Sequence, residues 1–136
     1  MYRELASAYA ATAQELGLRR IPVGDAFHLA NHDPQWGFHA LATPFDSQHA
    51  KTGELPDQTH SLNVGWAWKK EKDGQTKLSM DGHHASTAGE YLGACVWYEV
   101  LFGRSVVDNG FIPAGLDAGY AKFLRATAHR AVADLR

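Results

Sequence analysis

Residues 81–103 read DGHHASTAGEYLGACVWYEVLFG, and this stretch decides how the chain is interpreted. It places a carboxylate, Asp81, three positions before an imidazole, His84. A short turn brings two side chains at this spacing together. An Asp that accepts a hydrogen bond from one ring nitrogen fixes the tautomer and leaves the other nitrogen free to take a proton. Such a pair would supply two of the three members of a hydrolytic triad. The alternative is an Asp that caps a turn beside a His satisfied by the backbone.

The rest of the stretch predicts a helix over residues 87–102 that ends at Gly103. Thr87 and Glu90 have the spacing of a capping box, and the hydroxyl of Ser86 is placed to accept from backbone N–H groups. The helix is apolar on nearly every side. A helix of this kind is expected to be deeply buried.

Upstream, residues 2–16 carry apolar side chains at helical spacing, and Gly17 is suited to end that helix. Residues 19–23 are predicted to form a short strand, and residues 25–33 a short helix stopped by Pro34. A helix, a tight turn and a strand are the second half of a βαβ unit. The first helix is therefore expected to pack on a sheet.

The remainder of the chain predicts a hairpin and a last helix. Residues 34–61 show no period, which is typical of a functional lid or of a mobile loop. Residues 62–70 and 76–80 alternate like strands around a turn at Asp73-Gly74, and they deliver the chain to Asp81. Asp117 is placed to cap the final helix. No linker divides the chain, so residues 1–136 are expected to form a single domain.

The Asp-x-x-His block, followed by a small residue, a Ser and a helix, resembles the last conserved block of the SGNH (GDSL-type) hydrolases. Residues 21–27, IPVGDAF, resemble the family's last parallel strand and the turn after it, and residues 86–103 resemble its C-terminal helix. The resemblance implies an α/β fold, part of a three-layer, flavodoxin-like SGNH domain with a β-hairpin insertion and two C-terminal helices. It also implies that Asp81 and His84 are the acid and base of a Ser-His-Asp triad.

The nucleophile of such a triad has no counterpart in this sequence. Ala26 occupies the position of the family's serine after Gly24-Asp25, and the oxyanion-hole blocks are missing too. No serine of the chain lies in a strand-to-helix nucleophile elbow; the candidates are Ser7, Ser47, Ser61, Ser79, Ser86 and Ser105. The chain is therefore expected to be the C-terminal part of a hydrolase of carbohydrate or small acyl esters. Its nucleophile would come from upstream or from another chain, and the isolated chain is expected to be inactive.

Three side chains near the pair are candidates for substrate contacts. Trp66 and Trp68 share one face of the predicted strand and supply aromatic surface for a pocket wall, although such residues more often belong to a core. His83 is adjacent to His84 but points the other way in extended or loop backbone. It is expected to face solvent or a substrate.

The composition narrows the classes of partner. The net charge is −2 and no basic cluster is larger than the pair Lys69-Lys70, so neither nucleic acid nor a membrane surface is expected as a partner. The single cysteine, Cys95, leaves no internal disulfide and is expected to be buried. The N-terminus is not a signal peptide and no apolar run could span a membrane, so the cellular location stays open.

Two other functions remain open. The chain contains eight His residues, and Asp25, His28 and His32 would share one helix face, but solvated surface histidines are the favoured interpretation. Neither a metal nor another cofactor is expected. The main alternative to an esterase is a non-catalytic, homo-oligomeric binding module, because half of an α/β fold exposes apolar faces that a second copy would cover.

Overall fold

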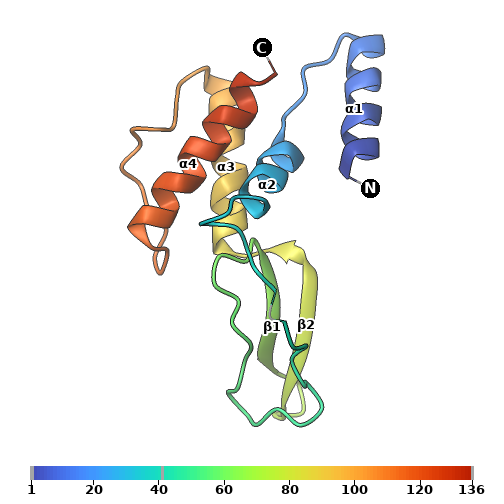
Figure 1. The fold of residues 1–136 in the computed structure, drawn as a ribbon, viewed down its shortest axis with the longest axis vertical. Coiled ribbons are helices and arrows are strands. Elements are labelled where there is room, and N and C mark those ends of the chain that lie inside the picture. Colours follow the sequence, from blue (N-terminus) through green and yellow to red (C-terminus); the bar gives the residue numbers. More distant parts are fainter. Residues whose placement is uncertain (1, 41, 136) are drawn as a thin grey trace.

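The computed structural model describes residues 2–40 and 42–135, and in these residues the fold is mixed α/β (Figure 1). Four helices accompany a single two-stranded antiparallel sheet. In chain order the elements are α1 (Tyr2–Leu16), α2 (Val23–Asn31), β1 (Asn63–Lys70), β2 (Thr76–Ala85), α3 (Thr87–Phe102) and α4 (Ala118–Ala133). The hairpin extends from one end of the helices, and α1 stands to one side of them.

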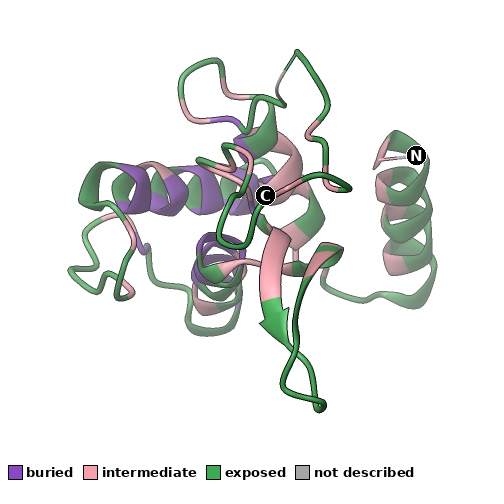
Figure 2. Ribbon diagram, turned by 90° about the horizontal axis from the view of Figure 1, so that it is seen from below, coloured by how far each residue is buried: buried purple, intermediate pink, exposed green. Residues whose placement is uncertain are grey.

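The core lies where α3 and α4 pack on each other and α2 packs on both. Leu92 and Val96 of α3 and Leu124 of α4 are fully buried there. Figure 2 shows the buried residues concentrated in this pair of helices. The predicted last helix is confirmed with Asp117 as its N-cap, and Tyr120 and Ala128 also lie on its buried face. The cysteine Cys95 is buried as predicted.

The predicted cap at Ser86 is confirmed for helix α3, whereas the predicted capping box is not. Ser86 is the N-cap: its backbone is extended, and its hydroxyl accepts from the Gly89 N–H at 3.3 Å. Thr87 is already helical, so its side chain cannot serve as the cap, and the predicted pairing of Thr87 with Glu90 is wrong. The predicted end is confirmed. Gly103 has a left-handed backbone (φ 64°), and its N–H donates to the Glu99 carbonyl at 2.9 Å.

The strand predicted over residues 19–23 is wrong. Residues 18–22 have no regular structure, and Val23 already belongs to α2. A strand needs a neighbour for its backbone N–H and C=O groups. The only sheet within the described residues consists of β1 and β2. The short second helix is confirmed, but it starts two residues earlier than predicted.

Helix α1 has the predicted bounds but does not pack on a sheet. Its first residue anchors it to α2, because the Tyr2 hydroxyl donates to Asp25 Oδ1 at 2.5 Å and the Tyr2 ring stacks on His28. None of its described residues is buried. The expected packing fails because the described residues place no strand beside α1.

The hairpin is confirmed, and its second strand is longer than predicted. β2 continues past Met80 to Ala85. Gly65 pairs with Asp81, whereas Asn63 pairs with Ala85. Residues 82–84 therefore face the single residue Val64, and β2 bulges at this point. The predicted acid–base pair lies on this bulge and not in a loop after the strand.

As the sequence predicted, the described residues of the long segment 34–61 form neither helix nor strand. Residue 41 is not described. The segment packs on β1. The Gln58 side chain forms two hydrogen bonds with the backbone of Trp66. It accepts from the Trp66 N–H at 2.5 Å and donates to the Trp66 carbonyl at 2.9 Å. The Trp68 indole N–H donates to the Glu54 carbonyl at 2.9 Å. The segment thus lies against the Trp66 side of the hairpin.

Candidate functional site

The bulge in β2 builds the acid–base pair from local backbone geometry. Oδ1 of Asp81 accepts the backbone N–H groups of His84 at 3.0 Å and of His83 at 3.2 Å. These two bonds curl residues 81–84 into a turn in which the carboxylate substitutes for a backbone carbonyl. Gly82 occupies the first turn position, where a small residue is easily accommodated. The turn brings the His84 ring back over the Asp81 carboxylate.

The two side chains are hydrogen-bonded in the orientation that general-base chemistry needs. His84 Nδ1 lies 2.9 Å from Asp81 Oδ2 and 3.1 Å from Oδ1. A carboxylate only accepts, so Nδ1 carries the proton and Nε2 of neutral His84 holds the free lone pair. Lys69 adds its ammonium group 3.8 Å from Oδ2. The backbone and side-chain hydrogen bonds from His84 hold the pKa of Asp81 well below its usual range.

The His84 imidazole is open to solvent. Its side chain is 82% exposed, whereas that of Asp81 is only 18% exposed. Among the described residues, none forms a hydrogen bond with His84 Nε2. The ring can accept a proton from a group that approaches from outside. The arrangement therefore supplies a base and its orienting acid, with space for a third group.

No serine of the described residues forms a hydrogen bond with His84. Four hydroxyls have local backbone partners: Ser61 with Asn63, Ser79 with the Ala67 carbonyl, Ser86 with Gly89 and the Ser61 carbonyl, and Ser105 with the Val107 N–H. The remaining two, Ser7 on α1 and Ser47 in the long segment, have no hydrogen bond to His84. Within the described part of the chain, no serine is positioned as the nucleophile of this base.

The predicted substrate-contact residues lie on different sides of the hairpin. Residues alternate between the two faces along a strand. Trp66 and Trp68 therefore share one face, while Gly65, the partner of Asp81, is on the other face with Lys69. Trp66 lines a pocket of about 440 Å³ between the hairpin and the long segment. Trp68 and His84 do not line it. His83 is exposed beside the pair.

A second Asp-x-x-His pair in the long segment has nearly the same local geometry. His49 Nδ1 lies 2.8 Å from Asp46 Oδ2, and Asp46 Oδ1 accepts the backbone N–H groups of Gln48 and His49. Sequence reasoning missed this pair although the same spacing was visible. It differs in exposure, because the Asp46 side chain is 66% exposed and has no cation beside it among the described residues. Asp46 and His49 therefore form a matched control for Asp81 and His84.

A third carboxylate–imidazole pair joins the two core helices. His129 of α4 places Nδ1 3.0 Å from both carboxylate oxygens of Glu99, which is buried on α3. Glu99 also accepts the Val106 N–H at 2.8 Å. The partners are thirty residues apart in the sequence, and no local motif indicates their contact. The pair ties α3, α4 and the loop between them.

The histidines proposed as an alternative metal site do not assemble one. His32 Nδ1 donates to the His28 carbonyl at 2.8 Å, and the His28 ring stacks on Tyr2. In residues 2–40 and 42–135, no group of three or more His, Cys, Asp or Glu side chains comes close enough to hold a metal ion.

Comparison with protein-family models, with curated proteins and with solved structures finds no match for this chain. Among the described helices, none is long and apolar enough to cross a membrane. The function must therefore be argued from the site itself.

Proposed function

We propose that Asp81 and His84 are the acid and base of an ester hydrolase of the SGNH type, and that the serine nucleophile and the oxyanion hole come from polypeptide outside this chain. The supporting observation is the oriented pair, in which His84 Nδ1 lies 2.9 Å from Asp81 Oδ2 and Nε2 is exposed. The three-layer fold of that family belongs to the same proposal. The substrate class is an acylated carbohydrate or another small acyl ester.

In this mechanism His84 Nε2 takes the proton from the attacking serine hydroxyl as its oxygen bonds to the ester carbonyl carbon. The imidazolium then returns the proton to the leaving alcohol. Asp81 keeps the ring in one orientation and stabilises the positive charge that forms on it. Because the pKa of Asp81 is held low, the carboxylate stays ionised through the cycle. A base placed in this way contributes roughly 10²–10⁴-fold in rate.

The test starts from the coding sequence in frame upstream of Met1. An encoded Gly-Asp-Ser block after an apolar strand is expected, and the longer protein is expected to hydrolyse p-nitrophenyl acetate. His84→Ala should lower kcat by roughly 10²-fold or more, and Asp81→Asn should lower it with little change in KM. His49→Ala is the matched control and should leave the rate unchanged. The comparison distinguishes the effect of His84 on the rate from that of His49.

Two results would overturn the proposal. One is a longer protein whose esterase activity is the same in His84→Ala as in the unaltered sequence. The other is the isolated chain itself hydrolysing the ester at an enzymatic rate that depends on His84, because the nucleophile would then lie inside the chain. A stop codon directly upstream would count for the non-catalytic binding module.

A further inference from the structure

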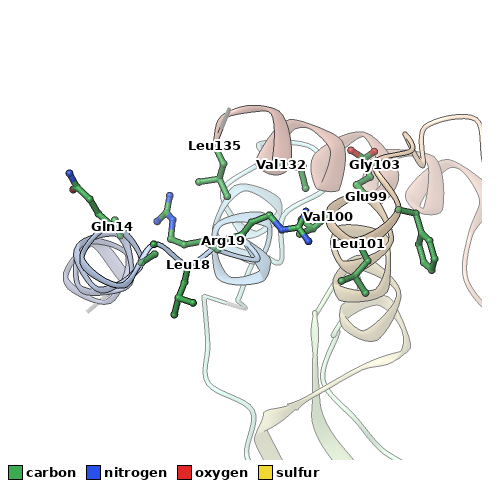
Figure 3. Close-up of a pocket in the computed structure, with 14 residues that line it drawn as sticks. Gln14, Leu18, Arg19, Glu99, Val100, Leu101, Gly103, Val132 and Leu135 are labelled. Atoms are coloured by element: carbon green, nitrogen blue, oxygen red, sulfur yellow. The ribbon is translucent and has the colours of Figure 1, made fainter.

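The groove beside α1 is not a built binding site. It has a volume of about 840 Å³ and lies between α1 and the C-terminal ends of α3 and α4 (Figure 3). Among the described elements, α1 contacts only α2, so no contact fixes the width of this groove. Leu101 of α3 is 54% exposed in it, although the sequence predicted α3 to be buried on every side. The groove is a gap between elements that do not touch.

The pocket between the hairpin and the long segment has walls that are held in place. Its volume of about 440 Å³ falls in the range of small-ligand sites. Its lining residues come from the end of α2, the long segment and the hairpin, and none comes from α1. The Phe45 ring meets the Trp66 indole edge to face, with ring centroids 5.7 Å apart. Together with the two hydrogen bonds from Gln58 to the Trp66 backbone, this contact fixes the long segment to β1 at the pocket.

The long segment is also closed at its two ends. The rings of Trp36 and His60 lie 5.1 Å apart, and both pack on the Tyr120 ring of α4. The Tyr120 hydroxyl donates to the His60 carbonyl at 2.9 Å. The His60 backbone is left-handed (φ 64°), a conformation that a residue with a side chain keeps only where its surroundings enforce it. The described chain therefore forms this pocket without the contribution of a second polypeptide.

The lining combines aromatic surface with hydrogen-bonding groups. Trp66 supplies an indole. Asn31 and Asn63 supply amides, and Asp57 supplies a carboxylate. Neither amide side chain is hydrogen-bonded within the described residues, so both can donate to a ligand and accept from it. Hydrogen bonds from Thr59 hold the pKa of Asp57 below its usual range, and this carboxylate is ionised at neutral pH.

These groups narrow the class of ligand. Among the described residues that line the pocket, none is Lys, Arg or His, so an anionic ligand would meet only the negative charge of Asp57. A purely apolar chain would take the amides and the carboxylate out of water without replacing their hydrogen bonds. A neutral sugar ring avoids both costs. Its hydroxyls donate to the carboxylate and bond to the amides, while its C–H face packs on the Trp66 indole.

Gly82 connects the pocket with the acid–base pair. It lines the pocket and lies on the bulge between Asp81 and His83. A Cβ placed on Gly82 would meet no atom within 4 Å, so the space beside this residue is open. A substituent on a ligand in the pocket has room to pass the bulge at this point.

We infer that the pocket binds one neutral sugar ring, and that an acyl group on this sugar extends past Gly82 to His84. The second part rests on the proposed function, because it makes the pocket the sugar subsite of the ester site. The first part does not, since it depends only on the walls and the lining groups of the pocket.

The first test is a titration of the 136-residue chain with the methyl β-glycosides of glucose, galactose and xylose, followed by ¹H–¹⁵N NMR. At least one is expected to bind with a dissociation constant of about 1 mM. The signals of the Trp66 indole N–H and of the Asn31 and Asn63 side-chain amides should shift. The indole of Trp97, which is exposed on α3, is the internal control and should not respond.

Two variants test the lining groups. Trp66→Leu should weaken binding about 10-fold, because the ring loses its aromatic surface. Asp57→Asn should weaken it by a similar factor of about 10, because it removes a charge-assisted hydrogen bond but keeps an oxygen for the Thr59 N–H. Asp73→Asn is the matched control. Asp73 accepts a backbone N–H at 2.9 Å in the same way as Asp57, but it lies outside the pocket and its variant should bind like the native chain.

The second test repeats the titration with each mono-O-acetyl ester of the glycoside that binds. At least one ester should also shift the ring signals of His84, while those of His49 stay unchanged. Binding of none of the glycosides, an equal response of Trp97, or tighter binding of hexanamide than of the sugar overturns the sugar pocket. Sugar binding without any response of His84 overturns its link to the ester site. None of these readouts requires turnover, so the pocket and the proposed function can fail separately.

Discussion

Nδ1 of His84 lies 2.9 Å from Oδ2 of Asp81, while Oδ1 of the same carboxylate accepts two backbone N–H groups of the bulge that carries the imidazole. One carboxylate therefore builds the turn and orients the base. This coupling makes the ring position a local property of residues 81–84. It also explains why the pair can be in place without the nucleophile.

Asp81→Asn is expected to change the tautomer of His84. A carboxylate accepts from Nδ1–H and leaves Nε2 unprotonated, whereas an amide can also donate to the ring and removes the preference. Long-range ¹H–¹⁵N NMR spectra of the neutral ring should show mainly the Nδ1–H form in the native chain. The variant should shift toward the Nε2–H form.

The matched control for that experiment is Asp46→Asn, which should change the spectrum of His49 and leave that of His84 as it was. The ring signals of His49 and His84 are distinguished by assigning each to its position in the sequence. A His84 ring that is mainly Nε2–H in the native chain would contradict the hydrogen bond on which the proposed mechanism depends.

Ser86→Ala is expected to lower the free energy of unfolding by about 1 kcal/mol, because the Gly89 N–H loses its side-chain cap. The Ser86 hydroxyl also donates to the Ser61 carbonyl at 2.8 Å, so the end of the long segment loses an anchor as well. Urea unfolding measures the change. Thr87→Ala is the neighbouring control and should change stability by less than about 0.5 kcal/mol. Equal losses of unfolding free energy in both variants would indicate that Thr87 also caps the helix, which the structure contradicts.

Glu99→Ala is expected to cost about 2–3 kcal/mol of stability, because it leaves the buried Val106 N–H without an acceptor and His129 without its partner. Glu99→Gln keeps a carbonyl oxygen at that place and should cost less than half as much. Thermal or urea unfolding gives both values. A Gln variant as unstable as the Ala variant would mean that the charge, and not the hydrogen bond to Val106, carries the stabilisation.

Sequence patterns predicted the elements that depend on local information. The helix over residues 2–16 and the end of a helix at Gly103 follow from a few neighbouring residues, and both are confirmed. The Asp81 to His84 turn is of the same kind, because its bonds join residues two and three apart. Such features need no knowledge of distant contacts.

Features that depend on distant contacts were not predictable in the same way. The strand expected over residues 19–23 fails because strand formation requires a partner, and the local sequence does not indicate whether one is present. The contact of Lys69 with Asp81 depends on the hairpin register, in which Gly65 pairs with Asp81 and Lys69 with Lys77. The pairing of Glu99 with His129 requires the packing of α3 on α4, which no local pattern encodes.

Cys95 makes the stability of the chain depend on pH in the alkaline range. Burial raises the pKa of its thiol from 9.0 to about 11. A raised folded-state pKa means that the stabilisation is complete below pH 9, where the thiol is neutral in both states. It is lost as pH rises from 9 to 11, because the unfolded chain ionises first. Two pKa units correspond to about 2–3 kcal/mol.

The Cys95→Ala variant isolates this effect, because burial also raises the pKa of Tyr120, to about 12, and both proteins retain that ring. The native chain should be more stable than the variant below pH 9, since the substitution leaves a small cavity. Its advantage should then shrink by about 2 kcal/mol between pH 9 and pH 11 in urea unfolding. A constant difference across that range would show that the thiol is reached by solvent in the folded state. In that case the contact between α3 and α4 would be looser than the buried position of Cys95 implies.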